Sequence, residues 1–360
     1  MTYNVNISNY RVGKTAYDQV DAICSEYGKK VAVIIGNHGY YQAKPFLEAE
    51  LKDSRLDLSE PIFYGGNCTY ENIDKLKQMA AVIEADMIFA VGGGRVVDTA
   101  KILGEKVGKP VFAFPTIASN CSPCTSVSIM YDEKGAFIRP EFLKDPPICA
   151  FIHTPLLAKA PIKYLWAGLG DTYAKYYEAS ISARGDELSH PLSLGVHISG
   201  QCAESVLKHG LGALKANEIG QVNDDFEQAA LTIIVTTAWV SILVTLSHTP
   251  DYNSGLAHAI YYTLTTVPGF DEERHLHGEM VAFGVLILLL VDGQDAEFKK
   301  VYDFNKKAKL PCRLADLELD MPTMENYLEA VTKMGDISHN PYQITVEMLR
   351  AAFVKLEAMY

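Results

Sequence analysis

Residues 86–107 read DMIFAVGGGRVVDTAKILGEKV, which joins an apolar run, a glycine turn and an amphipathic stretch. The run 86–91 is short and apolar after Asp86, as expected for a strand that is covered on both faces. Gly92, Gly93 and Gly94 end it, and glycines permit positive φ angles and close approach of the backbone to a ligand. The helical pattern of 95–107 follows, and free N–H groups at a helix start bind phosphate. The stretch therefore predicts a phosphate-binding turn. An ordinary tight turn stays an alternative, because the spaced GxGxxG pattern is absent.

The rest of the first half repeats this alternation of apolar runs and helical patterns. Alternating strands and helices predict a parallel sheet with helices on both faces, which binds ligands at the carboxyl ends of its strands. After about residue 150 the pattern changes, and from Thr154–Pro155, which is typical of a helix start, the periodicity is helical almost to the end. We therefore predict a Rossmann-like α/β dinucleotide-binding domain over residues 1–160 and an all-α domain over 161–360, with the active site in the cleft between them. The further strands are expected at 31–35, 61–64 and 110–114, and the further helices at 40–51 and 71–84.

Composition excludes several classes of protein. The chain has 360 residues, 48% hydrophobic and 21% charged, which is too apolar for a disordered protein. Its formal net charge of -12 argues against a nucleic acid or an anionic membrane as partner. The uncharged stretch Ala229–Ser247 approaches the length of a membrane span, but its many Ser and Thr residues favour a buried helix. Seven scattered cysteines and the lack of a signal-peptide pattern predict free thiols in the cytoplasm.

A second motif, PTIASNCSPC at residues 115–124, also follows an expected strand. Its small polar side chains are suited to contact a cofactor or a substrate at the strand end. Cys121 and Cys124 form a CxxC pair, which permits two other interpretations, a redox disulfide or half of a zinc site. No second CxxC accompanies the pair, so an incidental pair of thiols is favoured.

The helical half contains scattered groups that suit metal binding. Asp171, Lys175 and Glu178 share one helix face by spacing, and an exposed salt-bridged face is the simpler interpretation. His258 stands among apolar residues, where a hydrogen-bonded core histidine is the common case. His275 and His277 follow at the expected start of another helix. Asp171, His258 and His277 together would supply three ligands and leave one position open on a zinc-like ion.

The order of VGGG…DTAK, PTIAS, GLGDTYAKYYEA, HAI…TVP and HGEMVAFG resembles glycerol dehydrogenase and its relatives in the iron-containing (group III) alcohol dehydrogenase superfamily. The resemblance covers essentially the whole chain. It implies NAD(P)-dependent alcohol–ketone chemistry on a metal held by Asp171, His258 and His277, with a homo-oligomeric assembly. Lys175 stands where the iron enzymes have a further histidine, which favours zinc over iron. His275 is an alternative to His277 and, with Lys175 or metal-bound water, a candidate for the proton route.

The resemblance also assigns a set of positions to the dinucleotide. Gly92–Gly94 fall in the pyrophosphate loop. The cofactor-binding positions are Asn37, Gly93, Gly94, Arg95, Asp98, Thr116, Ser119, Thr125, Val127 and Tyr131.

Two positions depart from the pattern of glycerol dehydrogenases. Cys121 replaces the acid that would hold a polyol hydroxyl, and hydroxycarboxylate dehydrogenase-like relatives carry a cysteine in this region, so Cys121 is the predicted substrate residue. Asn37 replaces the acid that binds the ribose hydroxyls in NAD-specific members, so NADP stays open beside NAD.

The predicted reaction is hydride transfer between NAD(P)(H) and a small hydroxyl or carbonyl compound. The substrate is expected among 2-hydroxy or 2-oxo acids, hydroxyketones and polyols. Three alternatives stay open: a strictly NAD-linked glycerol dehydrogenase, a dehydroquinate-synthase-like lyase, and a non-catalytic protein acting through Cys121 and Cys124. The lyase would require several cations near the metal to bind a phosphate, and only Lys175 and Arg274 are found in these stretches.

Overall fold

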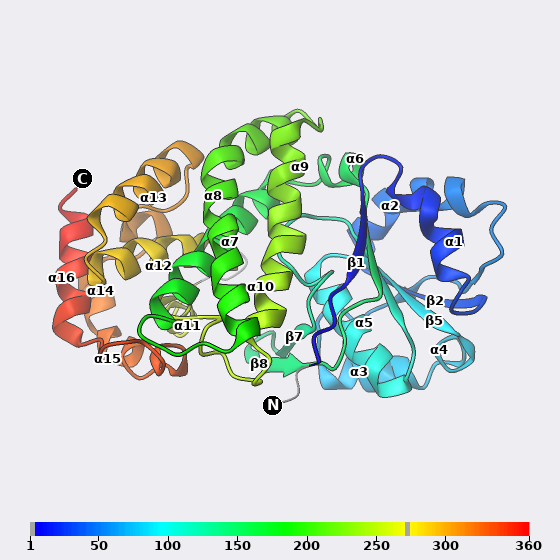
Figure 1. Cartoon of the computed structure of the whole chain (residues 1–360), viewed down its shortest axis with the longest axis horizontal. Coiled ribbons are helices and arrows are strands. Elements are labelled where there is room, and N and C mark those ends of the chain that lie inside the picture. Colours follow the sequence, from blue (N-terminus) through cyan, green and yellow to red (C-terminus); the bar gives the residue numbers. More distant parts are fainter. Residues whose placement is uncertain (1–3, 271–273, 360) are drawn as a thin grey trace. The chain divides into compact units, whose positions relative to one another are not determined.

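The computed structural model of the chain describes residues 4–270 and 274–359. These residues form two compact units, described separately below and drawn in Figure 1. The first unit runs up to Pro161 and includes Ala216–Glu227, and the second comprises Ile162–Lys215 and the chain from Gln228 onward. The short segment 216–227 differs from the predicted division at residue 160. It belongs to the first unit because, for example, the Asn217 amide donates hydrogen bonds to the carbonyls of Ala158 (2.7 Å) and Ala160 (3.0 Å).

The first unit contains a sheet in which every strand pairs in parallel, as predicted. The central strands are almost entirely buried, because both faces of the sheet are covered. The two strands at one side, β1 and β9, were not predicted. β1 alternates exposed and half-buried residues, so its apolar signal is weak. The strand order is β1 (Asn9–Val12), β9 (Cys149–Ile152), β6 (Val111–Pro115), β5 (Met87–Gly92), β2 (Lys30–Ile35) and β3 (Asp57–Leu58), with β4 (Ile62–Phe63) also paired to β2.

The helices of the first unit largely follow the predicted pattern, with one correction. The expected helix over 71–84 is two helices, because Met79 is extended (ψ 132°) and breaks the hydrogen-bond ladder. The Thr69 side chain caps the first of them by accepting a hydrogen bond from the backbone N–H of Asn72. The helices are α1 (Val20–Cys24), α2 (Asn37–Leu51), α3 (Tyr70–Lys77), α4 (Ala80–Glu84), α5 (Gly94–Val107) and α6 (Thr154–Leu157), with a 3₁₀ turn at Ala16–Gln19.

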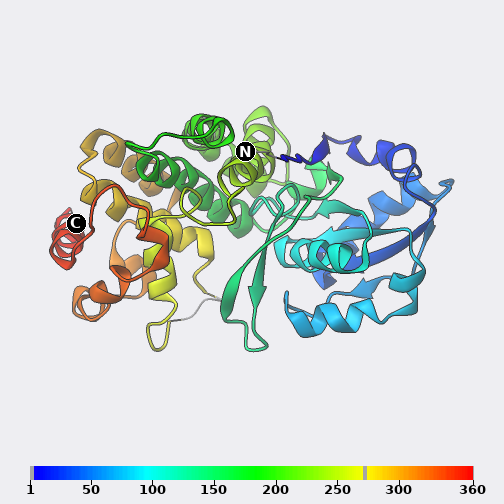
Figure 2. The ribbon, with the colours of Figure 1, turned by 60° about the horizontal axis from the view of Figure 1, so that its bottom comes forward.

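A two-stranded antiparallel hairpin, β7 (Val127–Tyr131) and β8 (Phe137–Phe142), was also not predicted. Figure 2 shows it as an extended ribbon. The pairing shifts register between Met130 and Tyr131, and Ser128 occupies one of the two buried positions of β7, so the sequence of this strand shows no apolar alternation.

Every element of secondary structure in the described residues of the second unit is a helix or a helical turn, which confirms the all-α prediction. The apolar stretch at 229–247 lies mostly in α9, a π-helical turn and α10, which together run over Asp224–Val244. By length and composition this is the one described helix that is long and apolar enough to cross a membrane, and most of it is buried inside the structure. The helices are α7 (Ile162–Ser182), α8 (His190–Glu218), α9 (Asp224–Leu231), α10 (Thr237–Val244), α11 (Leu256–Leu264), α12 (His277–Val291), α13 (Asp295–Ala308), α14 (Met321–Glu325), α15 (Leu328–Val331) and α16 (Val346–Glu357), with a π turn at Thr232–Thr236 and 3₁₀ turns at Leu314–Leu317 and Gly335–Ile337.

Candidate active site

Three helices of the second unit approach one another closely through glycine. A Cβ on Gly170 of α7 would lie 2.3 Å from the carbonyl oxygen of Gly278 in α12, and one on Gly278 would lie 2.0 Å from that of Ala167. A Cβ on Gly284 would likewise lie 2.6 Å from the Ala257 carbonyl of α11. Because no side chain intervenes, α7, α11 and α12 pack backbone to backbone. This packing brings Asp171, next to Gly170, to His277, next to Gly278.

Asp171, His258 and His277 therefore come together although they are far apart along the chain. One ligand atom from each lies within 4.8 Å of the others. The Asp171 Oδ1 atom is 3.6 Å from His258 Nε2 and 3.3 Å from His277 Nε2. Two ligands about 2.0–2.1 Å from a tetrahedral zinc ion would lie about 3.3 Å apart, so the donor set fits a divalent cation. Among the described residues, it is the one group of at least three His, Cys, Asp or Glu side chains whose ligand atoms lie this close to one another.

The surroundings of the cluster control its charge. Burial opposes protonation of His258, but the neighbouring Glu178 and Asp171 carboxylates outweigh it and raise the pKa of His258 to about 10. Burial likewise opposes ionisation of Asp171, yet His277 and His258 keep the pKa of Asp171 well below its usual range. The cluster therefore holds an ionised carboxylate beside two imidazoles, and cation binding must compete with protons for the imidazole nitrogens.

Lys175 and Glu178 are not on an exposed salt-bridged face, so that simpler interpretation is wrong. The ammonium of Lys175 donates hydrogen bonds to the Asn253 carbonyl (2.6 Å) and to Asn253 Oδ1 (2.9 Å). Glu178 is fully buried beside His258. Neither side chain is part of the ligand cluster, and Lys175 is hydrogen-bonded to the loop before α11.

His275 is also outside the cluster, although it was an alternative to His277. Its Nδ1 lies 3.2 Å from Glu279 Oε1, and its ring stacks on Phe270 with centroids 5.2 Å apart. The His277 ring instead packs against Tyr261, with centroids 4.3 Å apart. The geometry thus places His277, and not His275, with Asp171.

In the first unit, predicted cofactor positions gather at the carboxyl ends of three neighbouring strands. Asn37 follows β2 and starts α2, Gly92–Gly94 end β5 and start α5, and Thr116 follows β6. A Cβ on Gly39 would meet the Thr116 hydroxyl, so the start of α2 lies directly against the end of β6. Exposed Asn37 and the start of α5 are therefore at the edge where open parallel sheets bind nucleotides.

The glycine turn differs from the prediction in one respect. None of Gly92, Gly93 and Gly94 has a positive φ; Gly93 is extended at φ -81°, ψ -177°. They lie close against neighbouring side chains instead. Added Cβ atoms would lie 2.6 Å from Val96, 2.9 Å from Ile117 and 2.5 Å from Asn120, respectively.

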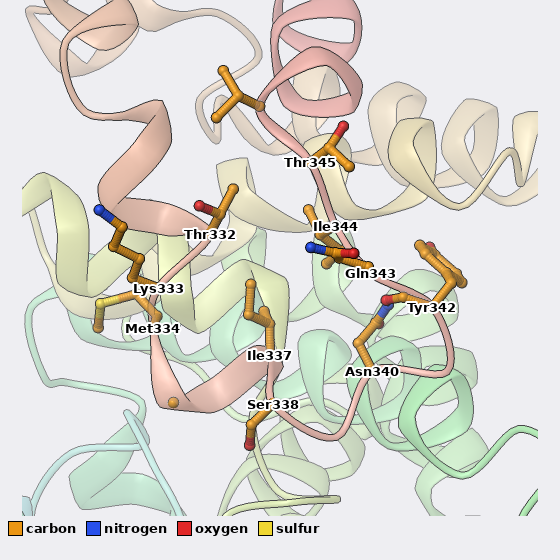
Figure 3. Close-up of a pocket in the computed structure, with 12 residues that line it drawn as sticks. Thr332, Lys333, Met334, Ile337, Ser338, Asn340, Tyr342, Gln343, Ile344 and Thr345 are labelled. Carbon is orange, nitrogen blue, oxygen red and sulfur yellow. The ribbon is translucent and has the colours of Figure 1, made fainter.

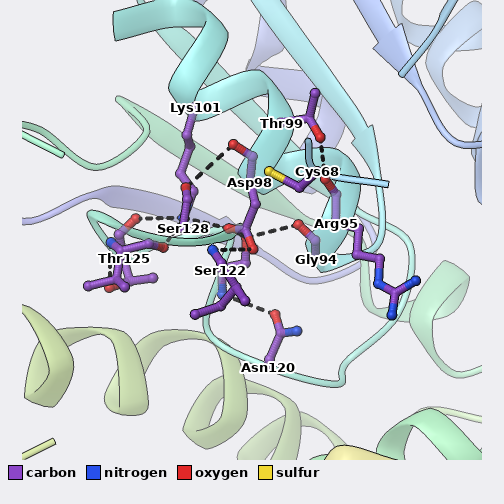
Figure 4. A network of polar contacts seen from close by, with 12 residues as sticks. Cys68, Gly94, Arg95, Asp98, Thr99, Lys101, Asn120, Ser122, Thr125 and Ser128 are labelled. Atoms are coloured by element: carbon purple, nitrogen blue, oxygen red, sulfur yellow. Dashed lines mark hydrogen bonds and ion pairs between the residues drawn. The ribbon is translucent and has the colours of Figure 1, made fainter. Parts of the chain in front are cut away.

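A buried polar network supports this turn (Figure 4). Lys101 pairs with Asp98 at 2.9 Å and donates hydrogen bonds to the carbonyls of Thr125 (3.1 Å) and Val127 (2.5 Å). Asp98 also accepts hydrogen bonds from the Ser122 hydroxyl (2.6 Å) and the Ile129 backbone N–H (3.3 Å). The Asp98 carboxylate, predicted to bind cofactor, is thus engaged within the protein and joins α5 to segment 120–129.

The other predicted cofactor and substrate positions line the same segment. The Arg95 guanidinium stands 4.8 Å from the ring centroid of Tyr131, a cation–π contact. Ser119 and Cys121 are half-buried, whereas Cys124 is fully buried. Burial raises the pKa of the Cys124 thiol, which makes it a poor redox nucleophile, and the two cysteines do not form a disulfide.

A hollow of about 700 Å³ lies in the loop segment 332–346 (Figure 3). One continuous stretch of chain supplies its lining, which includes none of the predicted site residues. Its cation, Lys333, pairs with Glu329 at 2.7 Å. We therefore do not assign the active site to this hollow.

Sequence and structure comparisons agree on the class of protein. The sequence model of iron-containing alcohol dehydrogenases matches residues 8–150. A glycerol dehydrogenase of Thermotoga maritima is 30% identical, over 96% of this chain and 94% of the relative. Hydroxycarboxylate dehydrogenase A of Escherichia coli K12 is 30% identical over 82% of each chain. The crystal structure of a probable glycerol dehydrogenase from Sinorhizobium meliloti 1021 superposes with a TM-score of 0.81 at 27% identity and covers 99% of both chains.

The parallel α/β unit and the helical unit have the fold of glycerol dehydrogenases. The chain belongs to the iron-containing alcohol dehydrogenase family and is glycerol dehydrogenase-like. It is therefore an oxidoreductase that acts on CH–OH groups, which excludes the lyase and the non-catalytic alternatives.

Sequence reasoning missed the supporting residues. The sequence motifs do not point to Lys101 or Glu178. The one available signal is that Lys101 stands among the apolar residues Ala100, Ile102 and Leu103, which is typical of a buried position. The i+7 spacing places Glu178 on the helix face of Asp171 but does not indicate its partner. Asn253 carries no signal that separates it from other loop residues.

Proposed function

We propose that the protein transfers hydride between a nicotinamide dinucleotide and a small 2-hydroxy or 2-oxo acid, hydroxyketone or polyol, with a divalent cation at Asp171, His258 and His277. The observation that carries the proposal is the convergence of these three side chains, with ligand atoms within 4.8 Å. A cation there would act as a Lewis acid toward the substrate oxygen. Zinc is the proposed metal, because Lys175, where iron enzymes have a histidine, is held by Asn253.

Residues of the first unit would bind the dinucleotide. Backbone N–H groups at the start of α5 would hold the pyrophosphate of the dinucleotide, since the first N–H groups of a helix point out of its end and the helix dipole favours an anion there. Gly93 and Gly94 have no side chain, which favours close approach of the ligand to the backbone. Asn37 would face the ribose at the end of β2, and Thr116, Ser119, Thr125, Val127 and Tyr131 would line the remaining cofactor positions. We further propose a cytoplasmic homo-oligomer, supported by the family pattern and by cysteines that form no disulfide among the described residues.

A neutral residue at position 121 favours an acidic substrate. The half-buried Cys121 stands where glycerol dehydrogenase-like sequences carry a carboxylate that holds a polyol hydroxyl. Without that negative charge, a substrate carboxylate would not be repelled. The similarity to hydroxycarboxylate dehydrogenase A supports the same substrate class. A glycerol dehydrogenase is the second candidate, because several relatives carry that name.

A substrate panel tests the proposal. Purified protein loaded with zinc is assayed with 2-oxo acids, hydroxyketones and polyols, each with NAD(H) and with NADP(H). We expect the highest kcat/KM for a 2-oxo acid or a hydroxyketone in the reducing direction. Dominant oxidation of glycerol with NAD would instead support the second candidate, and inactivity toward every carbonyl and polyol would reject the proposal.

The variant Cys121→Asp is expected to reverse the preference. A new carboxylate facing a substrate carboxylate at about 4 Å costs about 1–4 kcal/mol, so kcat/KM for 2-oxo acids should fall by a factor between about 5 and about 900. Activity toward glycerol should rise. Cys121→Ser, which adds no charge, is the matched control and should leave the ratio of the two activities near that of the wild type.

The variant Asn37→Asp is expected to select NAD over NADP. An aspartate at the end of β2 binds the ribose hydroxyls and repels the 2′-phosphate. We expect kcat/KM with NADPH to fall about tenfold or more, corresponding to about 1.4 kcal/mol of repulsion, while that with NADH is unchanged or improved. Steady-state kinetics with both coenzymes measure the ratio, and Asn37→Ala is the uncharged control. An unchanged ratio would show that position 37 does not face the ribose.

A further inference from the structure

Glu178 of α7 is the buried acid that lies against a candidate metal ligand. Its side chain is 0% exposed, and its Oε2 atom lies 2.7 Å from His258 Nδ1. We propose that Glu178 is a positioning residue that fixes the tautomer and the orientation of His258, so that Nε2 is presented to the cation. The inference rests on the proposed metal function of Asp171, His258 and His277 and adds a residue that acts through one of them.

The contact dictates which imidazole nitrogen carries the hydrogen. An ionised carboxylate only accepts hydrogen bonds, so His258 Nδ1 must donate to Glu178 Oε2. In the neutral ring the hydrogen is then on Nδ1, and the Nε2 lone pair is free. That Nε2 atom is the one that faces Asp171, at 3.6 Å. A carboxylate behind a ligating histidine raises its basicity as well as orienting it.

The second oxygen of Glu178 holds the helix that carries His258. Glu178 Oε1 accepts hydrogen bonds from the backbone N–H groups of Gly255 (2.8 Å) and His258 (3.0 Å), at the start of α11. Gly255 is the N-cap of α11 and supplies no side-chain cap, so Glu178 satisfies these otherwise free donors from another helix. A Cβ on Gly255 would lie 3.3 Å from Glu178 Cγ, which leaves little room to shift. One carboxylate thus positions both the imidazole ring and its backbone.

Neighbouring contacts restrain the same loop without touching the imidazole. Lys175, one turn before Glu178, donates to the carbonyl and the side chain of Asn253. The Ser254 hydroxyl donates to Asp336 at 2.6 Å. The loop before α11 is therefore held by several side chains, and only Glu178 among these contacts the ring. This difference provides a matched control, because Lys175→Gln loosens the loop and leaves the Glu178–His258 contact in place.

The decisive variant is Glu178→Gln. Its amide oxygen can still accept from the start of α11, but its NH₂ group would face Nδ1 and can only donate. Nδ1 would then have to accept, which moves the ring hydrogen to Nε2, the ligand position. We expect zinc affinity to fall about 10- to 100-fold, as for other partners of ligating histidines. The affinity is measured on the metal-free full chain by competition with a chelator, and the visible spectrum of bound Co²⁺ reports the ligand geometry.

The outcomes separate this inference from the proposed function. The thermal midpoint of metal-free Glu178→Gln should stay near that of the wild type, while zinc affinity falls and the Co²⁺ spectrum changes. Glu178→Asp keeps an acceptor and should bind zinc more tightly than Glu178→Gln. Wild-type affinity in Glu178→Gln, or an equal loss in Lys175→Gln, overturns the positioning role. If His258→Ala also binds zinc like the wild type, the proposed metal site itself fails.

Discussion

His258→Ala is expected to lose bound metal and to lower kcat/KM for the best substrate by about 10³-fold or more. Lewis-acid polarisation supplies several kcal/mol, and each 1.36 kcal/mol corresponds to a tenfold change in rate. Removing one ligand of three also leaves Asp171 and His277 as a weak two-point site. Elemental analysis of the purified protein measures metal content, and steady-state kinetics measure turnover. Asp171→Asn should give the same result, because it removes the only charged ligand.

His275→Ala is the matched control for this prediction. His275 is buried and lies beside Glu279 and Phe270, outside the ligand cluster. We expect it to retain metal, whereas His277→Ala should lose it. Loss of metal in His275→Ala with retention in His277→Ala would mean that the two histidines exchange roles. Normal metal content and turnover in His258→Ala would contradict the proposed mechanism as a whole.

The second large effect is expected from Lys101→Met, which should destabilise the first unit by about 3–5 kcal/mol. The Lys101 and Asp98 side chains are 1% and 9% exposed, and removing one partner leaves a buried charge without its counter-ion. The variant also releases the carbonyls of Thr125 and Val127, so the KM for the dinucleotide should rise. Denaturant unfolding followed by a probe in the first unit measures the free energy, and initial rates give the KM.

An exposed ion pair and a double variant serve as controls. Lys30 pairs with Glu84 at the surface, where both side chains are more than half exposed, so Lys30→Met should cost about 0–1 kcal/mol. Asp98→Asn combined with Lys101→Met should cost less than the sum of the two single variants, because no unpaired charge remains. A small effect of Lys101→Met, comparable to that of Lys30→Met, would show that the buried pair is not required for this part of the fold.

The central elements of the first unit were predictable because their local signals are strong. The run 86–91 and the helical pattern after Gly94 correspond to β5 and α5 within one or two residues, since a fully buried strand has a continuous apolar sequence. The strand β1 escaped prediction because it is an edge strand with the exposed residues Asn9 and Arg11. The hairpin β7–β8 escaped prediction because β8 has no buried residue and one of the two buried positions of β7 is a serine, so its sequence lacks the apolar alternation of a strand.

The motifs also named Asp171, His258 and His277, because the order of the motifs resembles a known family. The resemblance alone did not exclude the nearby His275 as a metal ligand in place of His277. His275 and His277 are two residues apart in similar surroundings, and only the crossing of α7 and α12 at Gly170 and Gly278 decides which one meets Asp171.

The sequence by itself determined the class of each half, the strand ends that gather the predicted cofactor residues, and the side-chain types that suit a divalent cation. These follow from periodicity, glycine placement and donor chemistry, which are local properties of the chain. Only the tertiary structure decided that Lys101 and Glu178 are buried partners of Asp98 and His258, and that Gly92–Gly94 lie against neighbouring side chains without a positive φ. Such pairings depend on contacts between segments distant in sequence, and burial then makes each pairing energetically important.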